Sequence, residues 1–189
     1  MKQGGSILCV LFIACASLPA TAEEACKIAQ LKNPAPTLAE IYAMAETRAK
    51  AWKADAEPAQ ISNTVLGPLQ PNGSAAAWHL LFYSDSAKAH VAIDTFRGSL
   101  NCYAEPGTAG RMPAFKPEFL RDGAKLYALA RQYGDPLIAQ GHIVMIGTAA
   151  APGTRHATWY INYSKEYRNA NVTVIVDANT GIVEKVLKD

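Results

Sequence analysis

The sequence reads WYINYS at residues 159–164 and VIVDANTGIV at residues 174–183. An earlier stretch follows nearly the same pattern, with WHLLFYS at residues 78–84 and VAIDTFRGSL at residues 91–100. In both places tryptophan begins the first segment, Tyr-Ser ends it, and an aspartate and a glycine follow at the same spacing. A repeat at so long a period predicts a duplicated supersecondary unit.

The segments around this repeat predict an α+β fold built from two tandem helix–strand–strand–strand repeats, each an antiparallel sheet covered by one helix. We expect the first repeat at residues 37–103 and the second at residues 117–189, with a Pro- and Gly-rich linker at residues 104–116. Thr37 and Glu40 have the spacing of a capping box and should begin the first helix. Gly134 is expected to end the second helix.

The first 22 residues have the pattern of a secretory signal peptide. Lys2 precedes an apolar stretch, and Ala20-Thr21-Ala22 forms a cleavage site. We therefore expect a mature chain that starts with an arm at residues 23–36 and is periplasmic or secreted. Lipidation at Cys15 is an alternative, because Ala14-Cys15 resembles the end of a lipobox. No later stretch of the sequence is long and apolar enough to cross a bilayer.

The mature chain would keep two of the four cysteines, Cys26 and Cys102. In an oxidising compartment these two most simply form a disulfide, which would tie the arm to the end of the first repeat. Cleavage removes one basic residue, so 18 − 1 = 17 basic residues face 16 acidic ones. This balance argues against a general nucleic-acid-binding protein, which needs a clustered basic face.

The sequence contains no catalytic, cofactor or metal motif that we recognise. It has no Gly-x-Ser-x-Gly elbow, no phosphate-binding glycine loop and no His-Glu-x-x-His spacing. His79 and His90 lie on strands that should be neighbours, but a metal pair needs further ligands. We interpret them as ordinary strand histidines, and His142 and His156 stand apart from acidic residues in sequence. The chain is accordingly predicted to have no enzymatic activity, cofactor or metal.

The C-terminal third, with its WYINY strand and its hydrophobic-Asp-Ala-x-Thr-Gly turn before the last strand, resembles the PepSY domain. The resemblance covers residues 117–189 and extends to residues 37–103 mainly through the internal repeat. It implies a helix packed on an antiparallel sheet. It also implies protease inhibition or protein binding, since PepSY domains occur in protease propeptides and cell-envelope proteins. Asp177 should accept hydrogen bonds from turn amides, and Gly181 should take a positive φ.

These observations predict an exported, non-catalytic binding module, either similar to a protease inhibitor or a protein-interaction protein of the cell envelope. The predicted partner is a protein, such as a secreted or envelope enzyme. Strand alternation places His79, Leu81, Tyr160 and Asn162 outward on one sheet face, where they would contact it. The outer faces of the repeats could instead pack together. A small-ligand carrier, or an enzyme with a site between the repeats, remains an alternative.

One mass measurement tests both the processing and the disulfide. The exported protein should have the mass of residues 23–189 less the hydrogens lost on oxidation, because cleavage follows Ala22 and Cys26 pairs with Cys102. In the chain-entropy model, closing a loop of this length stabilises the fold by about 4 kcal/mol. A lipid-modified chain starting at Cys15, or two thiols that alkylate without denaturant, would contradict the expectation.

Overall fold

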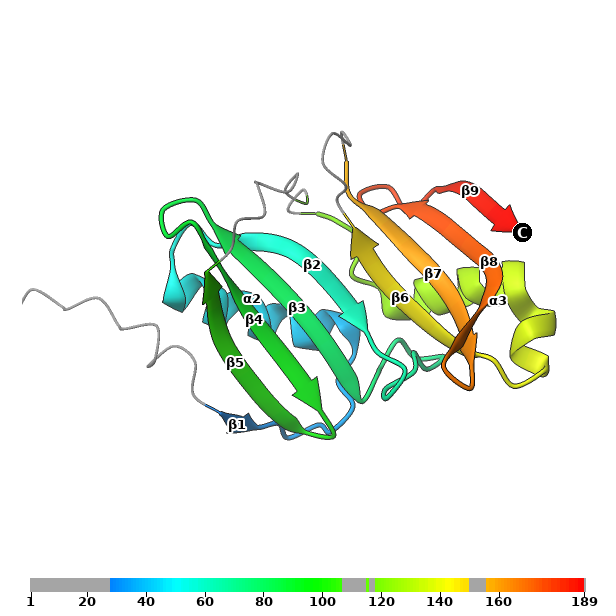
Figure 1. The fold of residues 1–189 in the computed structure, drawn as a ribbon, viewed down its shortest axis with the longest axis horizontal. Coiled ribbons are helices and arrows are strands. Elements are labelled where there is room, and N and C mark those ends of the chain that lie inside the picture. Colours follow the sequence, from blue (N-terminus) through cyan, green and yellow to red (C-terminus); the bar gives the residue numbers. More distant parts are fainter. Residues whose placement is uncertain (1–27, 107–114, 116–117, 150–155, 189) are drawn as a thin grey trace, which may run out of the picture.

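The structure is a computed structural model that describes residues 28–106, 115, 118–149 and 156–188. The predicted signal peptide and most of the predicted linker lie outside these residues. Two helices and nine strands are described (Figure 1). In chain order they are β1 (Ala29–Gln30), α2 (Leu38–Trp52), β2 (Glu57–Asn63), β3 (Ala77–Ser84), β4 (Ala89–Phe96), β5 (Ser99–Pro106), α3 (Gly123–Ala139), β6 (Ile143–Ala149), β7 (Thr158–Lys165), β8 (Arg168–Asp177) and β9 (Val183–Lys188).

All nine strands belong to one antiparallel sheet, in the order β1-β5-β4-β3-β2-β6-β7-β8-β9. The prediction of two tandem repeats, each with a sheet and helix of its own, is therefore wrong. The pairing of β2 with β6 contradicts it, because this pair joins the strands of the first half and those of the second half into one sheet. An unpaired strand edge leaves a row of backbone donors and acceptors without partners, and edge-to-edge pairing removes two such edges at once.

Side chains contribute to the β2–β6 seam, because its backbone register contains the single pair Ser62–Gly147. A further backbone bond, from the Leu69 amide to the Val144 carbonyl, reaches β6 from the loop after β2. The Ile61 amide donates to Thr148 Oγ1 at 2.9 Å, and the Ile146 amide donates to Asn63 Oδ1 at 2.6 Å. The Asn63 side-chain amide also donates to the carbonyl of Gly67 at 2.8 Å. Asn63 and Thr148 are both buried. These two polar side chains thus provide hydrogen bonds that a regular ladder would take from the backbone.

Both helices cover the same face of the sheet, so the molecule has two layers (Figure 1). The helix-facing positions of the strands are buried and include Trp78 and Trp159. The Trp78 indole donates to the Pro36 carbonyl at 3.0 Å, and the Trp159 indole donates to the Leu120 carbonyl at 3.0 Å. Each tryptophan therefore joins a central strand to the segment that leads into a helix.

The buried side chains form one cluster that extends over both parts of the sheet. Tyr42 of α2 packs edge-on against Phe119, which precedes α3, with ring centroids 4.9 Å apart. The Arg121 guanidinium lies 4.2 Å from the Tyr42 ring centroid and 4.8 Å from that of Phe119. Such contacts between rings and with a cation add to the free energy gained by burial. The sheet therefore continues across the seam, and so does the packing of side chains in the helix layer.

The start of α2 agrees with the sequence, and α3 is interrupted at the predicted stop Gly134 but resumes beyond it. Thr37 and Glu40 form the predicted capping box. Helix α3 starts at Gly123 with Asp122 as its N-cap, and it continues past Gly134 as a kinked helix to Ala139. Gly134 has no side chain because the Tyr163 ring occupies that space: an added Cβ would lie 2.2 Å from Tyr163 Cζ. The regular helix is interrupted at Gly134, whose φ of −136° and ψ of 19° are not helical, so the predicted stop is a kink at which the chain also packs closely against β7.

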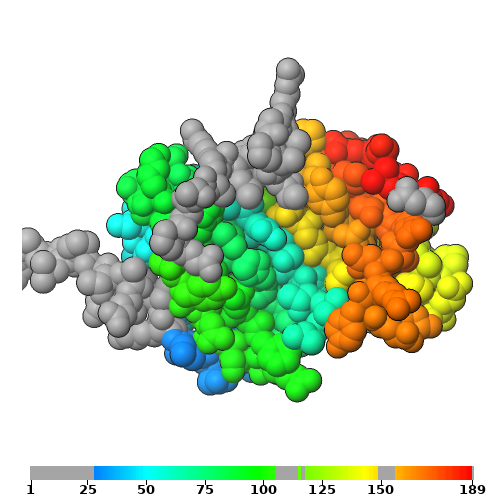
Figure 2. Space-filling view, viewed as in Figure 1, coloured from blue at the N-terminus to red at the C-terminus, as the bar shows by residue number. Residues whose placement is uncertain are grey.

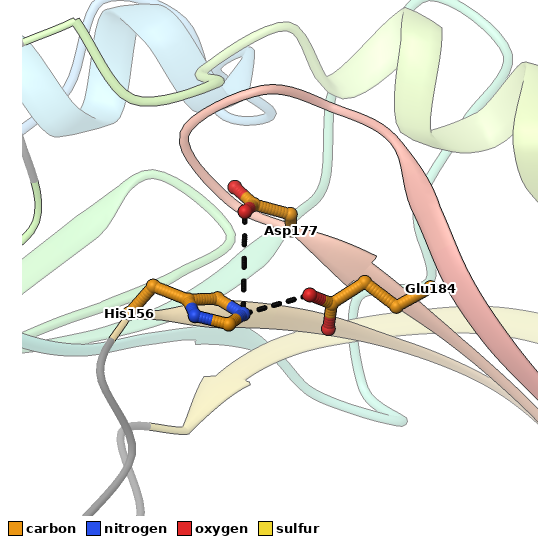
Figure 3. A group of neighbouring side chains, drawn as sticks. All are labelled: His156, Asp177 and Glu184. Carbon is orange, nitrogen blue, oxygen red and sulfur yellow. Dashed lines mark hydrogen bonds and ion pairs between the residues drawn. The ribbon is translucent and has the colours of Figure 1, made fainter.

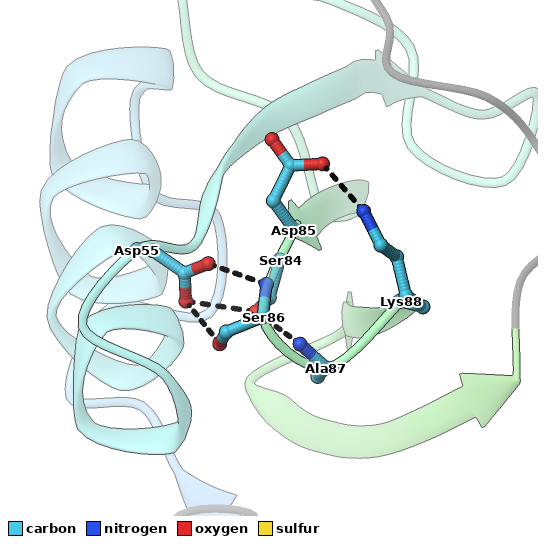
Figure 4. A network of polar contacts seen from close by, with 6 residues as sticks. All are labelled: Asp55, Ser84, Asp85, Ser86, Ala87 and Lys88. Atoms are coloured by element: carbon cyan, nitrogen blue, oxygen red, sulfur yellow. Dashed lines mark hydrogen bonds and ion pairs between the residues drawn. The ribbon is translucent and has the colours of Figure 1, made fainter.

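A polar network fixes the turn between β3 and β4 to the segment after α2 (Figure 4). Asp55 accepts hydrogen bonds from the Ser84 hydroxyl, the Ser86 hydroxyl and the Ser86 amide at 2.8–2.9 Å. The hydrogen bond from the Ser86 amide is the largest cause that lowers the pKa of Asp55, to about 2, and the hydrogen bond from the Ser84 hydroxyl is the next largest. All of these contacts use backbone and short side chains, so we interpret the network as structural.

Thr148→Val tests the seam. Valine keeps the shape of threonine but leaves the buried Ile61 amide without its acceptor, so the free energy of unfolding should fall by about 1–3 kcal/mol. Thr47→Val, on the exposed side of α2, is the matched control and should change it by less than about 0.5 kcal/mol. Chemical denaturation of both variants gives the values. Equal stability of Thr148→Val and the parent protein would contradict the role given to this side chain.

Candidate functional site

The face of the sheet opposite the helices is the candidate functional site. Figure 1 shows the described helices behind the strands, and Figure 2 gives the surface of the molecule from the same side. Directly paired residues of antiparallel strands point to the same face. The register therefore places one row of side chains across this face, from β5 to β9: Asn101, Asp94, His79, Ser62, Gly147, Tyr160, Ile175 and Lys185.

The four residues predicted to contact a partner all lie on this open face. His79 and Tyr160 belong to the row, and Leu81 and Asn162 lie two positions further along the same strands. All four are half-buried, whereas their sequence neighbours on the helix side are buried. The seam lies between the pair on β3 and the pair on β7. His79 and Tyr160 are therefore three strand spacings apart, about 14 Å. Ser62 and Gly147 fill the interval with little side-chain bulk.

His79 is oriented by a carboxylate on the same face. Its Nδ1 lies 2.6 Å from Asp94 Oδ1, and the Tyr103 hydroxyl donates to Asp94 Oδ2 at 3.0 Å. Desolvation raises the pKa of Asp94, but the hydrogen bond and charge of His79 and the bond from Tyr103 outweigh it and leave the pKa lowered. The β3–β4 register makes His79 and Asp94 direct partners.

A second histidine lies between two carboxylates at the far side of the face (Figure 3). His156 Nε2 lies 2.7 Å from Glu184 Oε1 and 4.0 Å from Asp177 Oδ2. The side chains of His156, Asp177 and Glu184 are 40%, 21% and 35% exposed. The sequence did not reveal this group, because its members come from three separate segments and match no ligand spacing. The D-A-N-T-G turn that fixes Asp177 is the one local signal that could have pointed to it.

The Asp177–Gly181 turn has the geometry that the sequence predicts. Asp177 Oδ1 accepts hydrogen bonds from the amides of Asn179 at 2.7 Å and Thr180 at 2.9 Å, and Gly181 has a φ of +73°. Desolvation raises the pKa of Asp177, but these two amide bonds and the charge of His156 lower it by more. The turn fixes the carboxylate through Oδ1, while Oδ2 lies 4.0 Å from His156 Nε2.

Cys102 lies in β5, where it pairs with Ile93, and Cys26 lies outside the described residues. Cys102 is the one cysteine among the described residues, so the structure does not test the Cys26–Cys102 bond, which stays a prediction. The cleavage site and Cys15 also fall outside the described residues. No helix in the described part of the chain is both long and apolar enough to span a membrane.

Two hollows in the described surface are open rather than enclosed. One of about 300 Å³ adjoins the open face, where His79, Asp94 and Phe96 contribute to its wall. Another of about 420 Å³ lies near the starts of both helices, beside Thr37, Arg121 and Asp122. The interior between helices and sheet is filled by large side chains such as Trp78, Trp159 and Tyr163.

Comparisons with known proteins give a fold and no family. No protein-family model matches this chain, and no curated protein matches it. The crystal structure of a candidate lipoprotein from Clostridium difficile 630 is similar, with a TM-score of 0.51 and 14% sequence identity. The match covers 78% of this chain and 92% of that chain. At this identity the likeness shows a shared fold, and membership of the PepSY family is not confirmed.

Asp94→Asn should destabilise the protein in a pH-dependent way. Because the folded pKa of Asp94 lies below its unfolded value near 3.9, the ionised form stabilises the fold above that pH. The stability lost in the variant should be below about 1 kcal/mol at neutral pH, since the pair is partly exposed. The difference in stability between the parent protein and the variant should decrease as the pH falls below about 4, and it should be lost once the pH is below the folded pKa of Asp94. Denaturation between neutral and acid pH, with Asp85→Asn as control, checks this. A difference that does not decline in acid would refute it.

Proposed function

We propose that this protein is an exported, non-catalytic recognition protein that binds a protein partner on the open face of its sheet. The observation that carries the proposal is the one-sided covering of the sheet: both described helices pack on one face. The opposite face presents half-buried aromatic, aliphatic and polar side chains in register across the seam.

The composition of this face suits a protein surface. Protein interfaces are enriched in tyrosine and combine apolar contacts with about one hydrogen bond per 100–200 Å². Tyr160 and Leu81 offer contact area, whereas His79 and Asn162 offer hydrogen-bonding groups. Asn162 Oδ1 accepts a bond from the Thr173 hydroxyl at 2.8 Å, which orients its amide. Because the side chains stand on paired strands, little backbone order has to be gained on binding.

Export is supported by the signal-peptide pattern of residues 1–22. It agrees with the structural neighbour, which is described as a candidate lipoprotein. The proposal places the mature protein in the periplasm or outside the cell, with lipidation at Cys15 as the other outcome of processing. In either case a Cys26–Cys102 disulfide would form in an oxidising compartment.

The class of partner follows from the PepSY resemblance of residues 117–189. Domains of that family are associated with protease inhibition and protein binding, so we propose a secreted or envelope enzyme as the partner. A carrier has less support, because large side chains fill the interior that it would need for a ligand. An enzyme site between the halves also has less support, because they meet edge to edge, where Asn63 and Thr148 are engaged by backbone amides.

Tyr160→Ala tests the face directly. The mature protein, Tyr160→Ala and Tyr167→Ala are used as baits in periplasmic or secreted extract, and captured proteins are identified by mass spectrometry. Tyr167 is the matched control, an exposed tyrosine in the turn between β7 and β8. Tyr160→Ala should weaken binding of the purified partner by about 1–2 kcal/mol or more and leave the thermal midpoint almost unchanged.

Two outcomes would overturn this assignment. Equal binding by the parent protein and Tyr160→Ala would show that the partner binds at a different surface. A large loss of stability in Tyr160→Ala with unchanged affinity would show that this face is itself covered in the folded protein.

A further inference from the structure

We propose that His156, Asp177 and Glu184 bind a divalent transition-metal ion of the zinc class. This site is independent of the partner surface proposed above, although it lies on the same sheet. Its three side chains each offer one ligand atom, and the three atoms lie within 4.8 Å of one another.

The sheet itself brings the three residues together. His156 lies two residues before β7, Asp177 ends β8, and Glu184 is the second residue of β9. These strands are neighbours in the sheet, so the segment before β7, the end of β8 and the start of β9 each bring one ligand to the same place. Glu184 occupies an irregularity in the β8–β9 register, where Ile175 pairs with Lys185 and Val176 pairs with Val183. A bulge of this kind re-aims a side chain out of the regular alternation.

The distances fit a metal after small movements. Ligand atoms about 2.1 Å from a tetrahedral zinc ion lie about 3.4 Å from one another. The His156 Nε2 distances to Glu184 Oε1 and Asp177 Oδ2, 2.7 and 4.0 Å, fall on either side of that value. The two carboxylates approach the imidazole from different directions (Figure 3). An ion could therefore enter between three atoms that already converge.

The turn fixes the Asp177 carboxylate in an orientation that suits a metal ligand. Both turn amides bond to its Oδ1, so the turn fixes the carboxylate while Oδ2 remains directed at the histidine. Hydrogen bonds that orient a ligating carboxylate are a regular feature of metal sites, where they raise affinity by reducing what must be ordered on binding. A turn with this geometry also occurs without metals. This turn differs because its carboxylate lies close to one imidazole and a second carboxylate.

Charge favours a cation at this position. Two carboxylates facing one imidazole carry a net negative charge even when the imidazole is protonated. A divalent ion bound by a neutral histidine and two carboxylates gives a neutral set. Nitrogen with carboxylate oxygens suits zinc and its neighbours in the first transition row better than calcium or magnesium, which prefer oxygen ligands alone. The partial exposure of the three side chains leaves room for water at a fourth position.

The test uses the tag-free mature protein, stripped of metal with a chelator and titrated with zinc chloride by calorimetry. We expect one zinc ion per chain. Zinc at about 100 times its Kd should raise the thermal midpoint by roughly 5–10 °C. His156→Ala and Glu184→Gln should each weaken zinc binding about tenfold or more, since a ligand is lost. His79→Ala, which alters the other histidine paired with a carboxylate, should bind zinc as the parent does.

Several results would overturn the proposal. Absence of zinc binding would show that the group is an ion pair only. Unchanged affinity in both His156→Ala and Glu184→Gln, or a loss confined to His79→Ala, would place the ion elsewhere. Calcium binding as tight as zinc would identify a general acidic patch. Circular dichroism of each variant, and anomalous scattering from a zinc-soaked crystal, separate loss of the site from loss of the fold.

Discussion

The hydrogen bonds that Asn63 and Thr148 make across the β2–β6 seam join the two halves of the protein into one sheet. They satisfy the buried amides of Ile146 and Ile61 at a junction where the backbone ladder has a single paired position. Without them, each half would retain a strand edge with unsatisfied backbone groups. With them, nine strands form one sheet, and residues from both halves share a register.

The seam also decides what the two faces of the sheet can do. One face is filled by the helices, and Trp78 and Trp159 join it to the segments before α2 and α3. Tyr42 and Phe119 make that layer continuous across the seam. The other face gains a surface about twice as wide as either half could offer. A partner that contacts both His79 and Tyr160 would therefore recognise the joined sheet rather than one repeat unit.

Much of the local structure could be predicted from the sequence, because it depends on short patterns. The alternation of residues 77–83 and 158–163 identified β3 and β7, Thr37 and Glu40 marked the start of α2, and Asp177 with Gly181 fixed the last turn. The outward positions of His79, Leu81, Tyr160 and Asn162 followed from the same alternation. The sequence also predicted that they share one face, but it did not predict the β2–β6 pairing that joins the two pairs in one sheet.

The features that escaped prediction depend on contacts between distant residues. Asn63 and Thr148 are single polar residues at strand ends, and no local pattern shows that they substitute for backbone bonds 80 or more residues away. Gly134 interrupts α3 as its sequence context predicts, but the close packing of the Tyr163 ring against it could not be predicted. His156 and Glu184 are 28 residues apart and match no motif, so only the sheet order brings them together.

Native-state hydrogen exchange at the seam can show whether the two halves unfold as one unit. If the seam makes one cooperative sheet, the amides of Ile61 and Ile146 should exchange only through global unfolding. Their exchange free energies should then equal the unfolding free energy from denaturation and match those of Ile93 in β4 and Ile161 in β7. Exchange of the two seam amides through a lower-energy opening, while the amides of β4 and β7 stay protected, would show two independently stable halves and contradict the account.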